Sequence, residues 1–161
     1  GNCIGVTGAP FDSFLTLRGL RTLHARMRAH GENAQRIAEL LTRHPAVARV
    51  YYPGLAAHPG HDLAQRQQRG FGAMVSFELL GGVENVKALL GSMELFSLAE
   101  SLGGVESLVA HPASMTHAAM DEAARERAGI SSTLVRLSIG IEEGDDLARD
   151  LTAGLDAAGR A

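Results

Sequence analysis

Arg136 is the residue whose type and setting best suit the chemistry of ligand binding. It lies in residues 134–141, where apolar residues alternate with polar or small ones, and such alternation predicts a strand with one buried face. The residues expected on the buried face are Val135, Leu137, Ile139 and Ile141, and those expected on the opposite face are Arg136, Ser138 and Gly140. A rigidly held guanidinium can grip a carboxylate by two parallel hydrogen bonds, which makes Arg136 a candidate anchor for an amino acid. A solvated or ion-paired arginine on a sheet is the alternative.

A glycine-containing segment, residues 99–107, is the second candidate for chemistry. It reads Ala-Glu-Ser-Leu-Gly-Gly-Val-Glu-Ser. Its small residues let a ligand approach the backbone closely, and its hydroxyl and carboxylate groups could bind a small polar molecule. A glycine-rich turn between two strands is the alternative, and composition alone favours the turn.

Histidines and early glycines provide weaker signals. The segment from His111 to His117 contains two histidines, but without a third ligand they are weak evidence for a metal, and no metal site is assigned. The seven histidines of the chain are interpreted as surface or capping residues. The glycines at positions 1, 5 and 8 lack the Gly-Lys-Ser/Thr that a phosphate-binding loop needs, which argues against nucleotide binding.

Length and composition limit the class of protein. With 161 residues, 45% of them hydrophobic, the chain is long enough for one domain with a packed core. The net charge of −3 comes without a basic stripe, which argues against nucleic acid, and no apolar run approaches the roughly 20 residues of a membrane span. Cys3 is the single cysteine, so no disulfide forms within the chain and a reducing cytoplasm is expected. The first residues do not resemble a secretory signal.

The first quarter of the chain is helical in character. Residues 10–44 have apolar residues at intervals of three and four, Pro10 suits a first turn, and a kink or a break is expected near His30 and Gly31. The apolar stripe of the first part comprises Phe11, Phe14, Leu15, Leu17, Leu20, Leu23 and Met27. A long, bent helix of this kind suits a segment that joins two domains.

The remaining residues alternate between strand and helix patterns. Strands are predicted over residues 47–52, 73–79, 95–98, 107–110 and 134–141. Helices are predicted over residues 61–69, 83–90 and 121–128, and from Asp145 and Asp146 onward with Leu147, Leu151 and Leu155 as an apolar ridge. This order favours an α+β fold, in which the long kinked N-terminal helix precedes a small, mainly antiparallel sheet with helices on one face.

Ordered motifs along the whole chain carry a resemblance to a known family. They are residues 5–8 (Gly-Val-Thr-Gly), 12–13 (Asp-Ser), 17–23 (Leu-Arg-Gly-Leu-Arg-Thr-Leu), 52–55 (Tyr-Pro-Gly-Leu), 70–74 (Gly-Phe-Gly-Ala-Met), 98–107, 111–117 and 136–142 (Arg-Leu-Ser-Ile-Gly-Ile-Glu). On these motifs the chain resembles the carboxy-terminal part of the cystathionine gamma-synthase, cystathionine gamma-lyase and methionine gamma-lyase family. The resemblance implies the small domain of the aspartate-aminotransferase-like fold. Residues 1–30 would be the end of a large pyridoxal-phosphate domain with its linking helix, and residues 31–161 the small domain.

The resemblance also implies a substrate site. The arginine of the last strand in such enzymes binds the substrate α-carboxylate, which corresponds to Arg136. Ser101 is expected beside that carboxylate and Thr116 near the same pocket, while Glu100 is similar to the acidic residue that gamma-synthases and gamma-lyases place near the distal part of cystathionine or cysteine. The expected reaction makes or breaks a carbon–sulfur bond at the γ-carbon of cystathionine or an O-acylhomoserine. Methionine gamma-lyase, O-acylhomoserine sulfhydrylase, a non-catalytic amino-acid-binding module and a purely structural domain are the alternatives.

The cofactor implied by the resemblance is pyridoxal phosphate, which these enzymes hold on a lysine of an amino-terminal domain. Lys87 is the single lysine of this sequence, and its helical setting is unlike the family's lysine motif. No catalytic or cofactor-binding residue is therefore assigned, and the chain by itself is predicted to be inactive. The expected partners are an amino-acid substrate and the missing amino-terminal pyridoxal-phosphate domain, in a cytoplasmic homotetramer.

Overall fold

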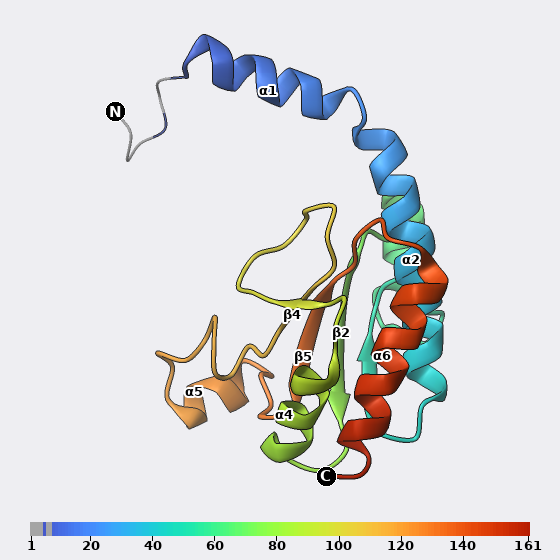
Figure 1. Cartoon of the computed structure of the whole chain (residues 1–161), viewed down its shortest axis with the longest axis vertical. Coiled ribbons are helices and arrows are strands. Elements are labelled where there is room, and N and C mark those ends of the chain that lie inside the picture. Colours follow the sequence, from blue (N-terminus) through green and yellow to red (C-terminus); the bar gives the residue numbers. More distant parts are fainter. Residues whose placement is uncertain (1–4, 6–7) are drawn as a thin grey trace.

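A five-stranded sheet lies at the centre of the fold (Figure 1). The computed structural model describes residue 5 and residues 8–161, so the expectations for Cys3, for Gly1 and for Val6 and Thr7 of the first motif lie outside the described residues. In spatial order the strands are β1 (Val47–Tyr51), β2 (Met74–Leu79), β5 (Leu134–Ser138), β4 (Leu108–Ala110) and β3 (Ser97–Leu98). Neighbouring strands pair antiparallel except β3 and β4, which are parallel. The predicted small, mainly antiparallel sheet is therefore confirmed.

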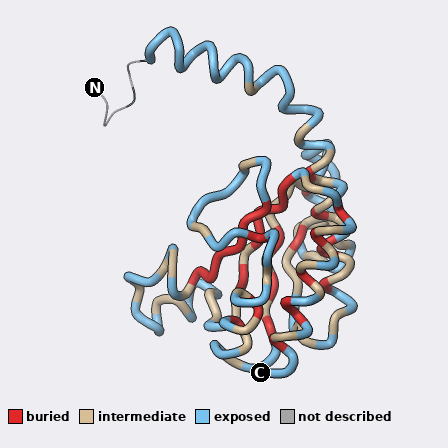
Figure 2. The backbone as a smooth tube through the Cα atoms, in the orientation of Figure 1, coloured by how far each residue is buried: buried red, intermediate tan, exposed pale blue. Residues whose placement is uncertain are grey.

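Helices precede, separate and follow the strands. They are α1 (Pro10–Leu20), α2 (Leu23–Arg43), α3 (His61–Gln67), α4 (Val83–Ser92), α5 (Glu122–Arg127) and α6 (Gly144–Ala158). Three of them, α2, α4 and α6, share one buried apolar cluster with the central strands, and Figure 2 shows the buried residues concentrated there. The α+β fold is confirmed. None of the helices in the described part of the chain has the length and apolar character needed to span a membrane.

The two central strands each bury alternate residues, and for β5 these are residues that the alternation predicted. β2 buries Val75, Phe77 and Leu79, and β5 buries Val135 and Leu137. Phe77 lies opposite Val135 and Val75 opposite Leu137, so their side chains stand on one face of the sheet. Burial of each side chain of this size contributes roughly 1.5–3 kcal/mol. The largest helical residues that complete this core are Ile37, Leu41, Leu89, Leu147, Leu151 and Leu155.

The break in the long N-terminal helix lies earlier in the chain than predicted. A turn at residues 21–22 separates α1 from α2, and Thr22 has φ −106° and ψ 1° there, with its hydroxyl donating to the backbone oxygen of Gly19 at 3.3 Å. α2 continues through His30 and Gly31 without interruption, so the break predicted at that position as the alternative to a kink is wrong. A glycine inside a helix costs only about 1 kcal/mol relative to alanine, and the packing of α2 on the core outweighs that cost.

α1 is helical as predicted, yet its apolar stripe is exposed. Pro10 occupies the first turn, where its missing N–H leaves no hydrogen bond unmade. No residue of α1 is buried, and Phe11, Phe14 and Leu17 are 67, 58 and 62% exposed. Figure 1 shows α1 projecting away from the sheet. The stripe is therefore present in the sequence but uncovered in this structure.

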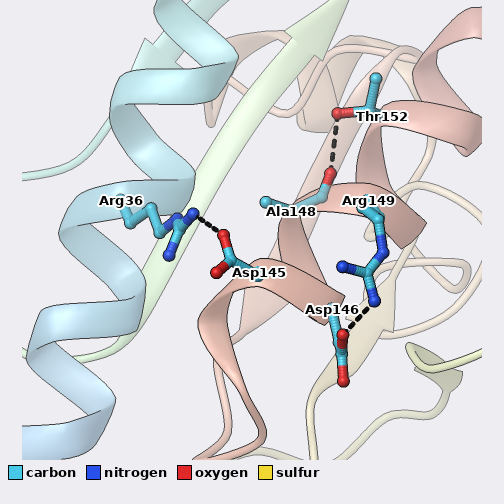
Figure 3. Close-up of polar contacts among 6 residues, drawn as sticks. All are labelled: Arg36, Asp145, Asp146, Ala148, Arg149 and Thr152. Carbon is cyan, nitrogen blue, oxygen red and sulfur yellow. Dashed lines mark hydrogen bonds and ion pairs between the residues drawn. The ribbon is translucent and has the colours of Figure 1, made fainter.

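Charged residues at the surface join α2 to the start of α6 (Figure 3). Arg36 of α2 forms an ion pair with Asp145, and Arg149 forms one with Asp146 within α6. These side chains are between 46 and 74% exposed, so each pair contributes at most about 1 kcal/mol. Asp145 and Asp146 stand in the first turn of the last helix as predicted, where the helix dipole favours acidic side chains.

Candidate functional site

Arg136 lies in the middle of β5, with a paired strand on either side. Its backbone lies opposite Ser76 of β2 and Ala110 of β4, and pairing along both edges fixes the position of its Cα. The side chain is half-buried, and its Nη2 donates a hydrogen bond to the backbone oxygen of Ser101 at 3.2 Å. A guanidinium carries five N–H donors. Arg136 is therefore held beside residues 99–107 with further donors that could bind a carboxylate.

Residues 99–107 form the connection between β3 and β4, as the turn interpretation predicted. This loop lies against the face of β5 that carries Arg136, since the N–H of Gly103 donates to Ser138 Oγ at 2.9 Å. Ser138 was expected on the face opposite the core, and it is nevertheless only 1% exposed because the loop packs over it. The two candidate sites of the sequence, the arginine and the glycine-containing segment, therefore form one site.

The strand prediction fails at its carboxyl end. β5 ends at Ser138, and Ile141 is 39% exposed, whereas it was expected to be buried. Past Ile139 the backbone pairs with the loop: the N–H of Ile141 donates to Val105 O at 2.9 Å. Alternation of side chains holds only while a segment stays in the sheet, so a local pattern could not reveal this change of partner.

The other three predicted site residues are exposed. Glu100 and Ser101 are adjacent in the loop, and Ser101 contacts Arg136 through its backbone oxygen. Thr116 lies in a separate turn after β4, where its hydroxyl is 2.8 Å from His117 Nδ1. In the described residues no hydrogen bond joins Thr116 to Arg136. The substrate-binding roles of these side chains, and the place of Thr116 in the same pocket, stay predictions.

Two histidines interpreted as surface or capping residues are in fact buried. His30 is 3% exposed, and its Nδ1 lies 2.6 Å from Ile139 O. His111 is 5% exposed, with Nδ1 2.7 Å from Ser114 Oγ and Nε2 2.9 Å from Ser132 O. The surface interpretation is wrong for both, because in each a backbone oxygen distant in sequence satisfies one ring nitrogen. Within the part of the chain that the structure describes, no group of three or more potential ligands is placed to hold a metal ion.

Lys87 does not fit a Schiff-base site. It lies on α4, where its side chain is 66% exposed and its Nζ pairs with Glu84 Oε1 at 2.7 Å. A lysine that forms a Schiff base must present an uncharged amine in a closed pocket, whereas this amine is solvated and ion-paired. Since the sequence contains no other lysine, the residues of this chain do not supply the attachment point for pyridoxal phosphate.

The sheet, its helical cover on one face and the arginine beside a glycine-containing loop define the class of protein: the carboxy-terminal part of an enzyme with the aspartate-aminotransferase-like fold. The structure matches the crystal structure of cystathionine gamma synthase from Xanthomonas oryzae pv. oryzae in complex with aminoacrylate and cysteine, with a TM-score of 0.92 and 65% identity. The match covers 99% of this chain and 41% of that chain. The crystal structure of the same synthase in complex with cystathionine matches to the same extent.

Sequence comparison identifies the family. The model of the family described as Cys/Met metabolism PLP-dependent enzyme, where PLP is pyridoxal phosphate, matches residues 1–156, and this chain belongs to that family. It is 55% identical over 159 residues to cystathionine gamma-synthase of Escherichia coli strain K12, 54% over 154 residues to cystathionine beta-lyase of Coxiella burnetii, and 51% over 155 residues to cystathionine gamma-lyase of Dictyostelium discoideum.

The matches cover nearly all of this chain but a minor part of each relative. They span 99, 96 and 96% of this chain, and 41, 40 and 40% of the three relatives. The chain thus corresponds to the carboxy-terminal part of enzymes that are about two and a half times as long. The family, the fold and the pyridoxal-phosphate cofactor of the family, all expected from the resemblance, are confirmed.

Proposed function

We propose that this chain is the substrate-carboxylate-binding portion of an enzyme that makes or breaks a carbon–sulfur bond at the γ-carbon of cystathionine or an O-acylhomoserine. The observation that carries the proposal is the placement of Arg136, held by strand pairing on both sides and in contact with the loop of Glu100 and Ser101. The similarity to the cystathionine gamma-synthases and to a cystathionine gamma-lyase supports it.

In this proposal four residues of the chain have binding roles. Arg136 holds the substrate α-carboxylate, and Ser101 lies beside the same group. Glu100 faces the distal part of cystathionine or cysteine, where its carboxylate attracts an ammonium group. Thr116 contributes to the same pocket. Fixed in this way, the substrate keeps the bond that breaks in one orientation, which removes much of the entropic barrier to reaction.

The cofactor chemistry belongs to the rest of the enzyme. Because Lys87 does not fit a Schiff-base site, we assign no chemical step to this chain, and the chain by itself is proposed to be inactive. The lysine, the partner of the pyridine nitrogen and the phosphate-binding groups are assigned to an amino-terminal pyridoxal-phosphate domain. The complete enzyme is proposed to act as a cytoplasmic homotetramer, in line with the resemblance.

The domain boundary is proposed near residue 30, inside α2. Residues 1–30 would end the large domain and link it to the small one, and residues 31–161 would form the small domain. The exposed apolar stripe of α1 supports this division, because an uncovered stripe of large apolar side chains marks a contact surface. We propose that the part of the polypeptide outside this chain covers it.

Replacement of Arg136 in the complete enzyme tests the proposed function. R136A should raise the KM for the amino-acid substrate roughly 10- to 150-fold, since a hydrogen bond to a charged group contributes about 1.5–3 kcal/mol. The visible absorption of bound pyridoxal phosphate should stay unchanged. R66A, at an exposed arginine of α3, is the matched control and should leave KM at the wild-type value. An unchanged KM in R136A would reject the assigned role.

Two pairs of assays separate the proposed reaction from its alternatives. Cystathionine alone and O-acylhomoserine with cysteine test for γ-elimination and γ-replacement at the same site. Methionine alone and O-acylhomoserine with sulfide test for the methionine gamma-lyase and the sulfhydrylase alternatives. E100Q should weaken binding of cystathionine more than binding of methionine, because only cystathionine carries a distal ammonium.

A further inference from the structure

The carboxylate of Glu142, just beyond β5, holds Ser107 at the end of the loop. Its Oε1 accepts a hydrogen bond from the backbone N–H of Ser107 at 2.6 Å, and its Oε2 accepts one from the Ser107 hydroxyl at 2.9 Å. The same hydroxyl accepts the N–H of Gly140 at 2.8 Å. Ser107 is 0% exposed and Glu142 is half-buried, so the donors of Ser107 are shielded from water, and bonds to a carboxylate are about twice as strong as neutral ones. We call these contacts the Ser107–Glu142 clasp.

The clasp belongs to the same short segment as Arg136. The other hydrogen bonds that fasten the loop to residues 136–142 run from Arg136 to Ser101, from Gly103 to Ser138 and from Ile141 to Val105. One stretch of backbone therefore carries both the proposed carboxylate anchor and the groups that hold the loop beside it. Glu142 is the acidic member of this set, and it contributes two of the bonds.

A side chain of α2 holds the backbone on either side of Ile141 and so fixes the position of Glu142. Asn33 Nδ2 donates to the backbone oxygens of Gly140 at 3.2 Å and of Glu142 at 2.8 Å. α2 is itself anchored in the core, so the backbone that bears Glu142 cannot shift without breaking these bonds. The position of the carboxylate relative to Arg136 is therefore set by the core and not by the loop.

We propose that Glu142 is a positioning residue for the amino-acid substrate, and that through Ser107 it sets where residues 100–103 stand relative to Arg136. The inference rests on the proposed function of Arg136 as the carboxylate anchor. A substrate that contacts Arg136 and the loop together binds well only if both are already aligned, because a loose loop must be ordered on binding. Loss of the clasp weakens substrate binding without removing a group that touches the substrate.

Replacement of Glu142 in the complete enzyme tests this role. E142A removes both acceptors and should raise the KM for the amino-acid substrate roughly 5- to 30-fold, with kcat changed less than KM. E142Q keeps an acceptor for the N–H of Ser107, so its KM should fall between those of wild type and E142A. The matched control is E143Q, at an exposed neighbour whose side chain makes no capping hydrogen bond, and it should behave as wild type.

Hydrogen exchange of the same holoenzyme variants distinguishes a loosened loop from general unfolding. The backbone amides of residues 101–107 should exchange roughly tenfold faster or more in E142A, with the amides of α2 and α6 unchanged. An unchanged loop exchange, or an unchanged KM, in E142A overturns the proposal. If E142A does not accumulate as folded enzyme, S107A, which removes the hydroxyl alone, is measured in the same way and the same outcomes decide.

R136A distinguishes a failure of this proposal from a failure of the proposed function. A raised KM in R136A together with a wild-type KM in E142A rejects the positioning role and leaves the anchor in place. A wild-type KM in R136A rejects the anchor, and the positioning role falls with it whatever the exchange of the loop shows.

Discussion

α1 and α2 follow one another in the chain and both carry apolar residues at helical intervals, but the structure buries only one of them. α1 has no buried residue. The residues that α2 buries are His30, Ala34, Ile37, Ala38 and Leu41, and the four apolar ones form one stripe that belongs to the core. Apolar spacing thus shows that a helix face needs a partner, but it does not show which element covers that face.

The largest expected effect is in α2, the helix that is packed against the core. I37A removes most of a side chain that is 0% exposed, and it should lower the free energy of unfolding by about 2–5 kcal/mol, because lost burial and a cavity act together. Urea denaturation of the 161-residue chain measures the change. A loss below about 0.5 kcal/mol, the size expected for an exposed position, would remove the contrast between the two helices.

A smaller loss is expected at Gly140, where the loop of residues 99–107 packs against the segment after β5. A Cβ added to Gly140 would lie 2.7 Å from the backbone carbon of Glu106 and would also overlap Val105 O, so G140A should cost about 1–3 kcal/mol by forcing the loop away. G31A is the control within α2, since a Cβ there meets nothing within 4 Å, and it should stabilise the chain by up to about 1 kcal/mol. Equal effects from both substitutions in urea denaturation would contradict the close approach at Gly140.

Alkaline pH provides a third test. It reports on the end of β1 and not on α1, because the two tyrosines of the chain are Tyr51 and Tyr52. The hydrogen bond to Glu78, helped by burial, raises the pKa of Tyr51 above its usual 10.0, and burial raises the pKa of Tyr52. As the pH rises, the tyrosines of the unfolded chain ionise before those of the folded chain. The free energy of unfolding is therefore highest below pH 10.0 and falls as pH rises through the raised pKa values. Urea denaturation between about pH 8 and 11 should show this fall, and Y52F should reduce it. If the free energy of unfolding did not fall over this pH range, both tyrosine side chains would be solvent-exposed in the folded chain.

The smallest expected effect is in α1, the helix whose apolar stripe is exposed. L17A in α1 should change the free energy of unfolding of this chain by no more than about 0.5 kcal/mol, because Leu17 is 62% exposed. In the complete enzyme the same substitution should lower thermal stability measurably if the proposed contact covers α1. S13A, which removes a polar side chain of the same helix, is the comparison. No difference between the chain and the complete enzyme would mean that the stripe of α1 has no partner there.

Local patterns located most of the elements. The strand predicted over residues 73–79 is Met74–Leu79, and the helix predicted over residues 83–90 is Val83–Ser92. Both are short periodic segments next to the Gly81-Gly82 break, so their limits depend on neighbours in the sequence. The helix break considered at Gly31 was wrong because the packing of α2, which local spacing does not record, keeps the helix continuous there.

The site was only partly predictable. Alternation placed Arg136 on the face opposite the core, and the loop of residues 99–107 was recognised as a connection between strands. Neither pattern could show that the loop lies against β5, or that Glu142 and Ser107 are bonded, because these residues are 35 positions apart. The burial of His30 depends on Ile139, which is 109 positions away.

The sequence by itself determined the periodic elements, the face of the last strand that carries the arginine, and the absence of a suitable lysine, because each of these depends on residue types and short spacings. Only the tertiary structure decided which apolar stripe is covered, where the long helix bends, and how the loop is fastened beside Arg136. Those outcomes depend on hydrogen bonds and packing between segments far apart in the chain, which form only when the sheet brings the segments together.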